Sequence, residues 1–266
     1  MKYSILTIPM FFRSLHTYMQ DKDIEAFRTR YDEMMRDIAC AGYHFADVMD
    51  IETHLLSREF IRETYAKYGL SVGCYLHMQD FFAGNAERCV EDALYYKAPV
   101  LMLVPVYKEE YESMSSEEIH ARFAGDYIPV LKEAKRKGLR VVIEDTPDLR
   151  VRLCRRDELD DLLSKMDGLE VVYDSGNMIL AGEEPVDYFK YFSGKTAYIH
   201  LKDMASRETD KGAVIGKGLI DLQEVAKAIK ESGYDGTMAI EFVAEKDKDL
   251  RLSLRNTLEY VKNFFR

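Results

Sequence analysis

Four residues of types that bind metal ions stand at or near the ends of short apolar runs in the second half of the chain. Each of these runs has the length of a buried strand. The four residues and their runs are Glu144 in RVVIE (140–144), Asp174 in EVVYD (170–174), His200 in AYIHL (197–201) and Glu241 in TMAIEF (237–242). Successive members are 30, 26 and 41 residues apart, which is about one strand-plus-helix repeat each time.

The three carboxylates among these residues would repel one another if they met in one small space. Three carboxylates at close range raise each other's pKa, and burying an unpaired charge costs several kcal/mol. A divalent cation removes this cost. Three carboxylates and one imidazole suit Mn²⁺, Mg²⁺, Co²⁺ or Zn²⁺, and the set contains no cysteine that would favour a softer metal. This chemistry would explain why an apolar strand carries His200 at its end.

Each residue also has a structural explanation when it is taken alone. A histidine at the end of a strand is often a hydrogen-bonded core residue, and a glutamate at the same place often pairs with a lysine. Four candidate ligands on four successive strands are harder to explain in this way. The set as a whole therefore favours a metal site.

The elements that would position these residues alternate along the whole chain. Eight apolar runs are separated by segments with helical spacing of apolar residues, such as 221–232, where Asp221 can cap the helix and Leu222 and Val225 share a face. The eight runs cover 3–8, 43–49, 71–78, 99–107, 140–144, 170–174, 197–201 and 237–242. Many are apolar at consecutive positions, which is typical of parallel strands that are covered on both faces.

This pattern predicts a single (β/α)8 TIM barrel that spans residues 1–266 as one domain. In such barrels the reactive groups lie at the carboxyl ends of the strands, so the four residues should share one rim. The alternative is an open, doubly wound sheet. That fold usually carries a glycine-rich turn after its first strand, and the segment IPMFFRSL has none.

Composition restricts the partners. The formal net charge is −10 and no basic cluster stands out, so we expect neither a nucleic acid nor a membrane as partner. The most apolar stretch, 99–106, is too short to cross a bilayer. The four cysteines have no C-x-x-C spacing and indicate reduced thiols in a cytoplasmic protein. The N-terminal segment MKYSILTIPMFF is expected to be a strand and not a signal peptide.

Several motifs resemble one known family, the xylose-isomerase-like TIM barrels, also called the sugar phosphate isomerase/epimerase group. The motifs are VVIED (141–145), VVYDSGN (171–177), YIHLKD (198–203) and GKGLIDLQEVAKAIKESGYDGTMAIEF (216–242). The last is the most specific, because G-x-G-x-x-D, a helix and a strand ending in Glu recur together. The resemblance covers the chain from about residue 40 onward.

This resemblance implies that Glu144, Asp174, His200 and Glu241 bind one divalent metal ion. It also implies that the two glutamates are the acid/base pair, one removing a proton beside a carbonyl and the other returning it through an enediolate. The implied substrate is a small carbohydrate or a cyclic polyol ketone such as an inosose. The implied activity is isomerase or epimerase.

The chain also departs from the family pattern. Many members have a histidine where this chain has Asn177, which can still bind a sugar hydroxyl. Strand four carries Pro105, and no Asp-x-His follows strand seven, which argues against phosphodiester hydrolysis of the endonuclease IV type. Besides Asn177, the candidates for substrate binding are His77, Asp203 and Arg207.

Two alternatives to an isomerase or epimerase remain at this point. A dehydratase would use the same metal but end the enediolate by expelling water, and a non-catalytic barrel would bind a sugar without turnover. No basic cluster that would bind a phosphate is apparent, so we expect an unphosphorylated substrate. A homodimer is a further expectation, because barrels with short loops often dimerise.

Overall fold

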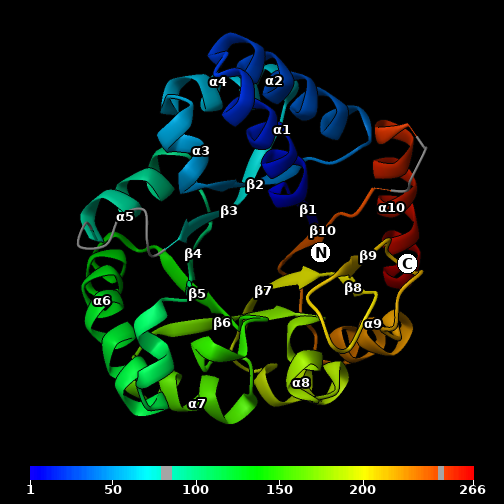
Figure 1. Ribbon diagram of the computed structural model, residues 1–266. Coiled ribbons are helices and arrows are strands. Elements are labelled where there is room, and N and C mark those ends of the chain that lie inside the picture. The colour runs from blue at the N-terminus through cyan, green and yellow to red at the C-terminus, as the bar shows by residue number, and fades with distance from the viewer. Residues whose placement is uncertain (79–85, 245–248) are drawn as a thin grey trace.

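Eight parallel strands form one sheet that curves into a nearly closed barrel, with helices around the outside (Figure 1). The computed structural model describes residues 1–78, 86–244 and 249–266. The barrel strands are β1 (Lys2–Leu6), β2 (Phe45–Met49), β3 (Ser71–Met78), β4 (Val100–Val104), β5 (Arg140–Glu144), β6 (Leu169–Asp174), β7 (Thr196–Leu201) and β10 (Thr237–Glu241). This architecture confirms the predicted α/β TIM barrel.

The helices follow the strands in the order expected for βα repeats. They are α1 (Ile8–Asp21), α2 (Ile24–Cys40), α3 (Asp50–Leu55), α4 (Arg58–Tyr68), α5 (Ala86–Tyr95), α6 (Ser116–Lys137), α7 (Arg156–Lys165), α8 (Pro185–Phe192), α9 (Leu222–Glu231) and α10 (Leu250–Phe265). Helix α9 buries Leu222 and Val225, and the Asp221 carboxylate accepts from two backbone N–H groups at its start, as the sequence predicts. Each helix buries one face because apolar residues repeat at helical spacing.

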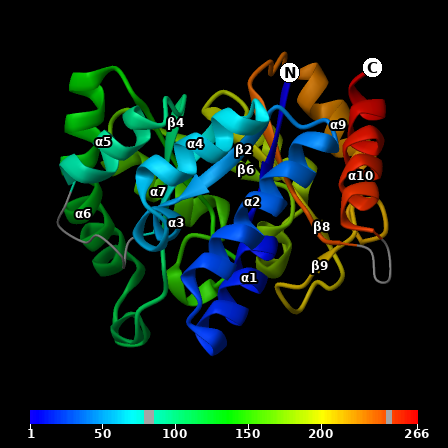
Figure 2. The same ribbon diagram turned by 90° about the horizontal axis from the view of Figure 1, so that it is seen from above.

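The N-terminal segment differs from its prediction. Strand β1 ends at Leu6 and α1 begins at Ile8, with a proline in the first turn, so the apolar residues that follow belong to a helix. Phe11 of α1 is fully buried and packs against Phe27 of α2, with ring centroids 5.7 Å apart. Figure 2 shows α1 at the end of the barrel opposite to the N-terminus, which is the carboxyl end of the strands.

The register brings the predicted residues to that same end. Asp174 of β6 pairs directly with His200 of β7, while Ala239 of β10 pairs with His200 and leaves Glu241 two residues further along. Glu144 is the last residue of β5. Beyond β7, the short strands β8 (Asp203–Met204) and β9 (Gly212–Ala213) form an antiparallel hairpin at this end of the molecule (Figure 2).

The barrel has one seam. In the strand order β1-β10-β7-β6-β5-β4-β3-β2, neighbours share backbone hydrogen bonds, but the described strands β1 and β2 do not pair with each other. Side chains cross the gap instead. Ser4 Oγ donates to Asp47 Oδ1 over 2.6 Å, and Thr7 Oγ1 donates to the Glu52 carboxylate over 3.1 Å. The first of these bonds joins the two strands where the backbone ladder is missing, and the second joins the segments that follow them.

Candidate metal centre

Glu144, Asp174 and His200 meet at the carboxyl end of the barrel. One possible ligand atom from each lies within 4.8 Å of the other two. The Nδ1 atom of His200 is 2.5 Å from Glu144 Oε1. Asp174 and His200 are buried, whereas 16% of the Glu144 side chain is exposed. These three predicted residues, which come from three adjacent strands, therefore form one cluster.

Glu241 lies at the edge of this group and not within it. It is outside the 4.8 Å set, and its Oε2 atom is 3.9 Å from the ammonium of Lys202. Its side chain is 26% exposed. Because β5 and β10 are separated only by β6 and β7, Glu144 and Glu241 stand at the two ends of an arc of four strands. The metal-binding and acid/base roles predicted for Glu241 stay predictions.

The cluster has the donors that a divalent cation needs. Two carboxylates and one imidazole are the oxygen and nitrogen ligands that such ions prefer. Asp174 Oδ1 accepts from the backbone N–H groups of Gly176 and Asn177, which holds the carboxylate in place. Its Oδ2 atom is buried and has no hydrogen-bond partner within the described chain. An unpaired buried oxygen is costly, and a cation would satisfy it.

The pKa values reflect charges that are crowded and poorly hydrated. Burial raises the pKa of Asp174 to about 7, with the neighbouring Lys202 opposing the shift and Glu144 adding to it. Burial disfavours protonated His200, but the carboxylates of Glu144, Asp47 and Asp174 together outweigh this effect and raise the pKa of the imidazole to about 9. Without a cation, the cluster therefore holds protons near neutral pH, and a metal ion would have to displace them.

Lys202 supplies a positive charge that the sequence prediction did not place in the site. Its buried ammonium donates to Asn177 Oδ1 and lies 3.7 Å from Asp174 Oδ1. The pKa of Lys202 is raised, because the carboxylates of Asp174 and Glu241 outweigh the cost of burial. Glycine at position 176 makes room for this side chain, since a Cβ there would lie 2.8 Å from Lys202 Cε.

Asp145 and Asp50 are further buried acids at this end of the barrel. Asp145 follows Glu144, and neither of its carboxylate oxygens has a hydrogen-bond partner in the described residues. Burial and the nearby Asp174 hold its pKa well above the usual range. Asp50 follows β2, and its Oδ2 accepts from the backbone N–H of Met78. Each directly follows a strand, which is the signal in the sequence that could have found them.

The four residues predicted to bind substrate have different surroundings. His77 is buried, with Nδ1 3.0 Å from Asp50 Oδ2, and Asn177 donates through Nδ2 to the backbone carbonyl of Asp145. Asp203 is buried and accepts from backbone N–H groups of the following loop. Arg207 is half exposed and pairs with a glutamate at the start of α8. Their binding of substrate stays a prediction.

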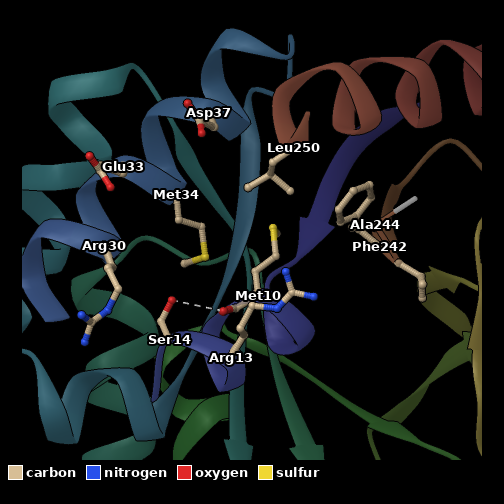
Figure 3. A pocket seen from close by; sticks show the side chains of 11 residues that line it. Met10, Arg13, Ser14, Arg30, Glu33, Met34, Asp37, Phe242, Ala244 and Leu250 are labelled. Atoms are coloured by element: carbon tan, nitrogen blue, oxygen red, sulfur yellow. Dashed lines mark hydrogen bonds between the residues drawn. The ribbon is translucent and has the colours of Figure 1, made fainter. Parts of the chain in front are cut away.

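A separate hollow of about 330 Å³ lies between α1, α2 and the segment after β10. Figure 3 shows that apolar side chains such as Met10, Met34 and Phe242 line it, together with charged groups that include Arg13 and Arg30. None of the eight residues predicted for the site lines this hollow. It is therefore a different feature of the molecule from the metal centre.

The structure is a TIM barrel with a candidate metal site at its strand ends, and sequence comparison identifies the family. The family model described as Xylose isomerase-like TIM barrel matches residues 76–264. The chain belongs to this family. Within the described part of the chain, no helix has both the length and the apolar character needed to cross a membrane.

The curated relatives match part of the chain in sequence, whereas some solved structures match its whole length. Inosose dehydratase of Lacticaseibacillus casei is 31% identical over an alignment of 108 residues, and the match covers 34% of this chain and 36% of that protein. The match thus spans about a third of that relative's length. A D-tagatose 3-epimerase-like protein has a TM-score of 0.73 at 21% identity, covering 100% of this chain and 97% of the other.

A third comparison is the IOLI protein crystallised with a bound zinc atom. It has a TM-score of 0.71 at 14% identity, and the match covers 100% of this chain and 96% of the other. At this identity, as for the D-tagatose 3-epimerase-like protein, the likeness establishes the fold alone.

Proposed function

We propose that this protein transfers a proton at the carbon beside the carbonyl of a small polyhydroxy ketone, with the help of a divalent cation. The observation that carries the proposal is the cluster of Glu144, Asp174 and His200 on three adjacent strand ends. Glu241 would complete the ligand set from the fourth strand. The zinc named with the IOLI protein supports a metal in this fold, without deciding which metal binds here.

The burial of the four residues suggests which of them hold the cation and which transfer protons. Asp174 and His200 are buried and would mainly hold the cation. Glu144 and Glu241 are partly exposed at the two ends of the arc, so they can reach a substrate and exchange protons with it. When bound, the cation would polarise the carbonyl and hydroxyl oxygens of the substrate. One glutamate would remove the proton and the other would return it.

Two glutamates at opposite ends of the site favour isomerisation or epimerisation. The D-tagatose 3-epimerase-like protein supports this branch by its name. Dehydration is the second candidate, and the name inosose dehydratase supports it. In that case Glu241, beside the ammonium of Lys202, would pass the proton that it removes from the carbon to a departing hydroxyl group, which would leave as water. Both branches begin with the same proton removal.

Solvent exchange tests this common step. The Mn²⁺-loaded protein would be incubated in D₂O with inososes and ketoses, and the recovered sugars analysed by NMR and mass spectrometry. Deuterium on the carbon beside the carbonyl supports the proposal. A product with the same formula as the substrate, apart from exchanged deuterium, indicates epimerisation or isomerisation. A product that has lost one water indicates dehydration. Sugar binding without exchange or product would contradict the proposal and favour a non-catalytic barrel.

Replacing either glutamate tests the acid/base roles. Glu144→Gln and Glu241→Gln should each lower the turnover number by about 10²- to 10⁴-fold, because amides cannot exchange the proton. Glu170→Gln is the matched control, since Glu170 pairs with Arg140 at the other end of the barrel. Turnover in either site variant equal to that of Glu170→Gln would refute the assignment. Circular dichroism would show that all three variants are folded.

A further inference from the structure

A buried carboxylate lies behind the metal centre, inside the barrel. Asp47 of β2 is fully buried, although nothing in the sequence gives it a role. Its Oδ1 atom accepts two hydrogen bonds, from Ser4 Oγ over 2.6 Å and from the Tyr198 hydroxyl over 2.7 Å. Burying a carboxylate costs several kcal/mol unless its oxygens find donors. Both donors bind the same oxygen, which leaves the other one unpaired.

That second oxygen faces His200. Asp47 Oδ2 lies 3.9 Å from His200 Nε2, and neither atom has a hydrogen-bond partner among residues 1–78, 86–244 and 249–266. Both side chains are almost completely buried, so bulk water does not replace the missing partner. Nε2 can donate a hydrogen bond and Oδ2 can accept one. A shift of about 1 Å would bring them to hydrogen-bond distance and lower the free energy of the folded protein.

The neighbouring strand leaves space for this arrangement. A Cβ atom at Gly73 of β3 would lie 2.6 Å from Asp47 Oδ1 and would also collide with Ser4 Oγ. Real Cβ atoms do not approach so closely, so any larger residue would displace the carboxylate or the hydroxyl. Glycine at this position therefore allows the group formed by Ser4, Asp47 and Tyr198 to occupy the interior of the barrel.

We propose that Asp47 is a positioning residue for His200: its Oδ2 accepts the Nε2 proton and fixes the ring so that Nδ1 faces Glu144 and Asp174. This inference rests on the proposed function, in which a cation binds at Nδ1. The 2.5 Å contact between His200 Nδ1 and Glu144 Oε1 is too short for two atoms that both bind one cation. Metal binding would therefore move the imidazole ring away from Glu144. Because the two ring nitrogens lie on opposite sides, this movement brings Nε2 towards Asp47.

General metal-site chemistry supports such a role. Histidine ligands usually donate their second N–H group to a carboxylate or carbonyl, which sets the tautomer and the ring orientation. Loss of such a partner typically weakens metal binding by about 10- to 100-fold. The same loss is expected here.

Asp47→Asn tests the proposal with Glu52→Gln as the matched control. In the Asp47→Asn variant, the Ser4 and Tyr198 hydroxyls should hold the new amide oxygen at the Oδ1 position. The amide NH₂ group then turns towards His200, and the acceptor is removed. Glu52 is a buried carboxylate that accepts from Thr7 and Tyr31, away from the metal ligands.

The first measurement is the dissociation constant for Mn²⁺ and Zn²⁺, obtained by competition with a chromogenic chelator. Asp47→Asn should raise it about 10- to 100-fold, and Glu52→Gln should change it less than about threefold. Wild-type affinity in Asp47→Asn, or an equal loss in both variants, would overturn the proposal. If Asp47→Asn does not fold, Tyr198→Phe provides a second test, because it frees the carboxylate from one of its two anchors and should weaken metal binding by a smaller factor.

The second measurement does not depend on metal binding. ¹⁵N NMR of the His200 side chain should show a slowly exchanging Nε2 proton in the wild-type protein and in Glu52→Gln, and a rapidly exchanging one in Asp47→Asn. Equal exchange in all three proteins would overturn the role of Asp47. If the wild-type protein bound no divalent cation, the proposed function would fail, and the NMR experiment would still decide whether Asp47 positions His200.

Discussion

At the scale of single residues, Lys202 balances the acids of the site. Its ammonium lies 3.7 Å from Asp174 Oδ1, 3.9 Å from Glu241 Oε2 and 3.4 Å from Asp210 Oδ1. Only 5% of its side chain is exposed. A buried charge that loses its partner typically costs about 3–5 kcal/mol. Lys202 and the acids therefore depend on one another, most of all when no cation is bound.

Lys202→Met should lower the free energy of unfolding of the metal-free protein by about 3–5 kcal/mol, because methionine leaves the carboxylates without their counter-charge. Saturating Mn²⁺ should restore part of this loss, since the cation would neutralise the same carboxylates. Chemical denaturation with and without Mn²⁺ would measure both effects. Lys211→Met, at an exposed lysine beside β9, is the control and should change little. A Lys202→Met protein as stable as this control would contradict the idea.

The sequence could predict the residues at the strand ends but not those that reach the site from elsewhere. Glu144, Asp174 and His200 each lie at or next to the end of an apolar run, and parallel strands bring such ends together. Asp47 lies within its run, and it meets Tyr198 across 151 residues of chain. No local pattern encodes such a contact, because it depends on how side chains pack across the finished barrel.

At the scale of elements, Asp203 of β8 organises the loop between β9 and α9. Its Oδ2 accepts from the backbone N–H groups of Gly216 and Gly218 over 2.9 and 2.8 Å, and its Oδ1 accepts from those of Met204 and Ile220. A Cβ at Gly218 would collide with this carboxylate. The carboxylate thus replaces the regular backbone partners that a loop lacks.

Asp203→Asn should lower the free energy of unfolding by about 1–3 kcal/mol. The NH₂ group of asparagine would lie opposite backbone N–H groups, and two donors cannot form a hydrogen bond. Asp235→Asn, at an exposed aspartate, should have little effect. Equilibrium unfolding in urea would compare the two. A rise in KM with unchanged stability would instead indicate that Asp203 contacts substrate, as the family resemblance suggests.

The barrel strands were easier to predict than helix α1 and the hairpin of β8 and β9, for a physical reason. A parallel strand covered on both faces is apolar at consecutive positions, so the run stands out. Helix α1 begins soon after β1 ends, and its Ile8, Met10 and Phe11 extend the same apolar stretch. A short apolar segment does not distinguish a helix from a strand. The hairpin of β8 and β9 has only two residues per strand and carries no periodic pattern.

At the scale of the whole molecule, buried acids connect stability to pH. Burial raises the pKa of Glu52 to about 7 from an ordinary value of 4.5, although Tyr31 and Thr7 donate hydrogen bonds to it. Burial similarly raises the pKa of Asp47 to about 6. Between about pH 4.5 and 7 the folded protein therefore binds protons that the unfolded chain has released, so stability falls as pH rises through this range.

Glu52→Gln should reduce this dependence, because glutamine has no proton to lose. From about pH 5 to about pH 7.5 the wild-type free energy of unfolding should fall by more than that of the variant, with a difference on the order of 3 kcal/mol. Denaturant unfolding at several pH values would measure both slopes. Equal slopes would show that Glu52 does not retain its proton in the folded state.

The seam between β1 and β2 has a consequence for how the ring of strands comes apart. Seven of the junctions between neighbouring strands are held by backbone pairing, whereas this one, within the described residues, depends on a few hydroxyl contacts to buried acids. Local opening begins where the fewest cooperative bonds must break. We therefore expect local unfolding of the barrel to begin between β1 and β2. Because Asp47 lies at this seam, a hydrogen bond from His200 to Asp47 would also help to keep the barrel closed.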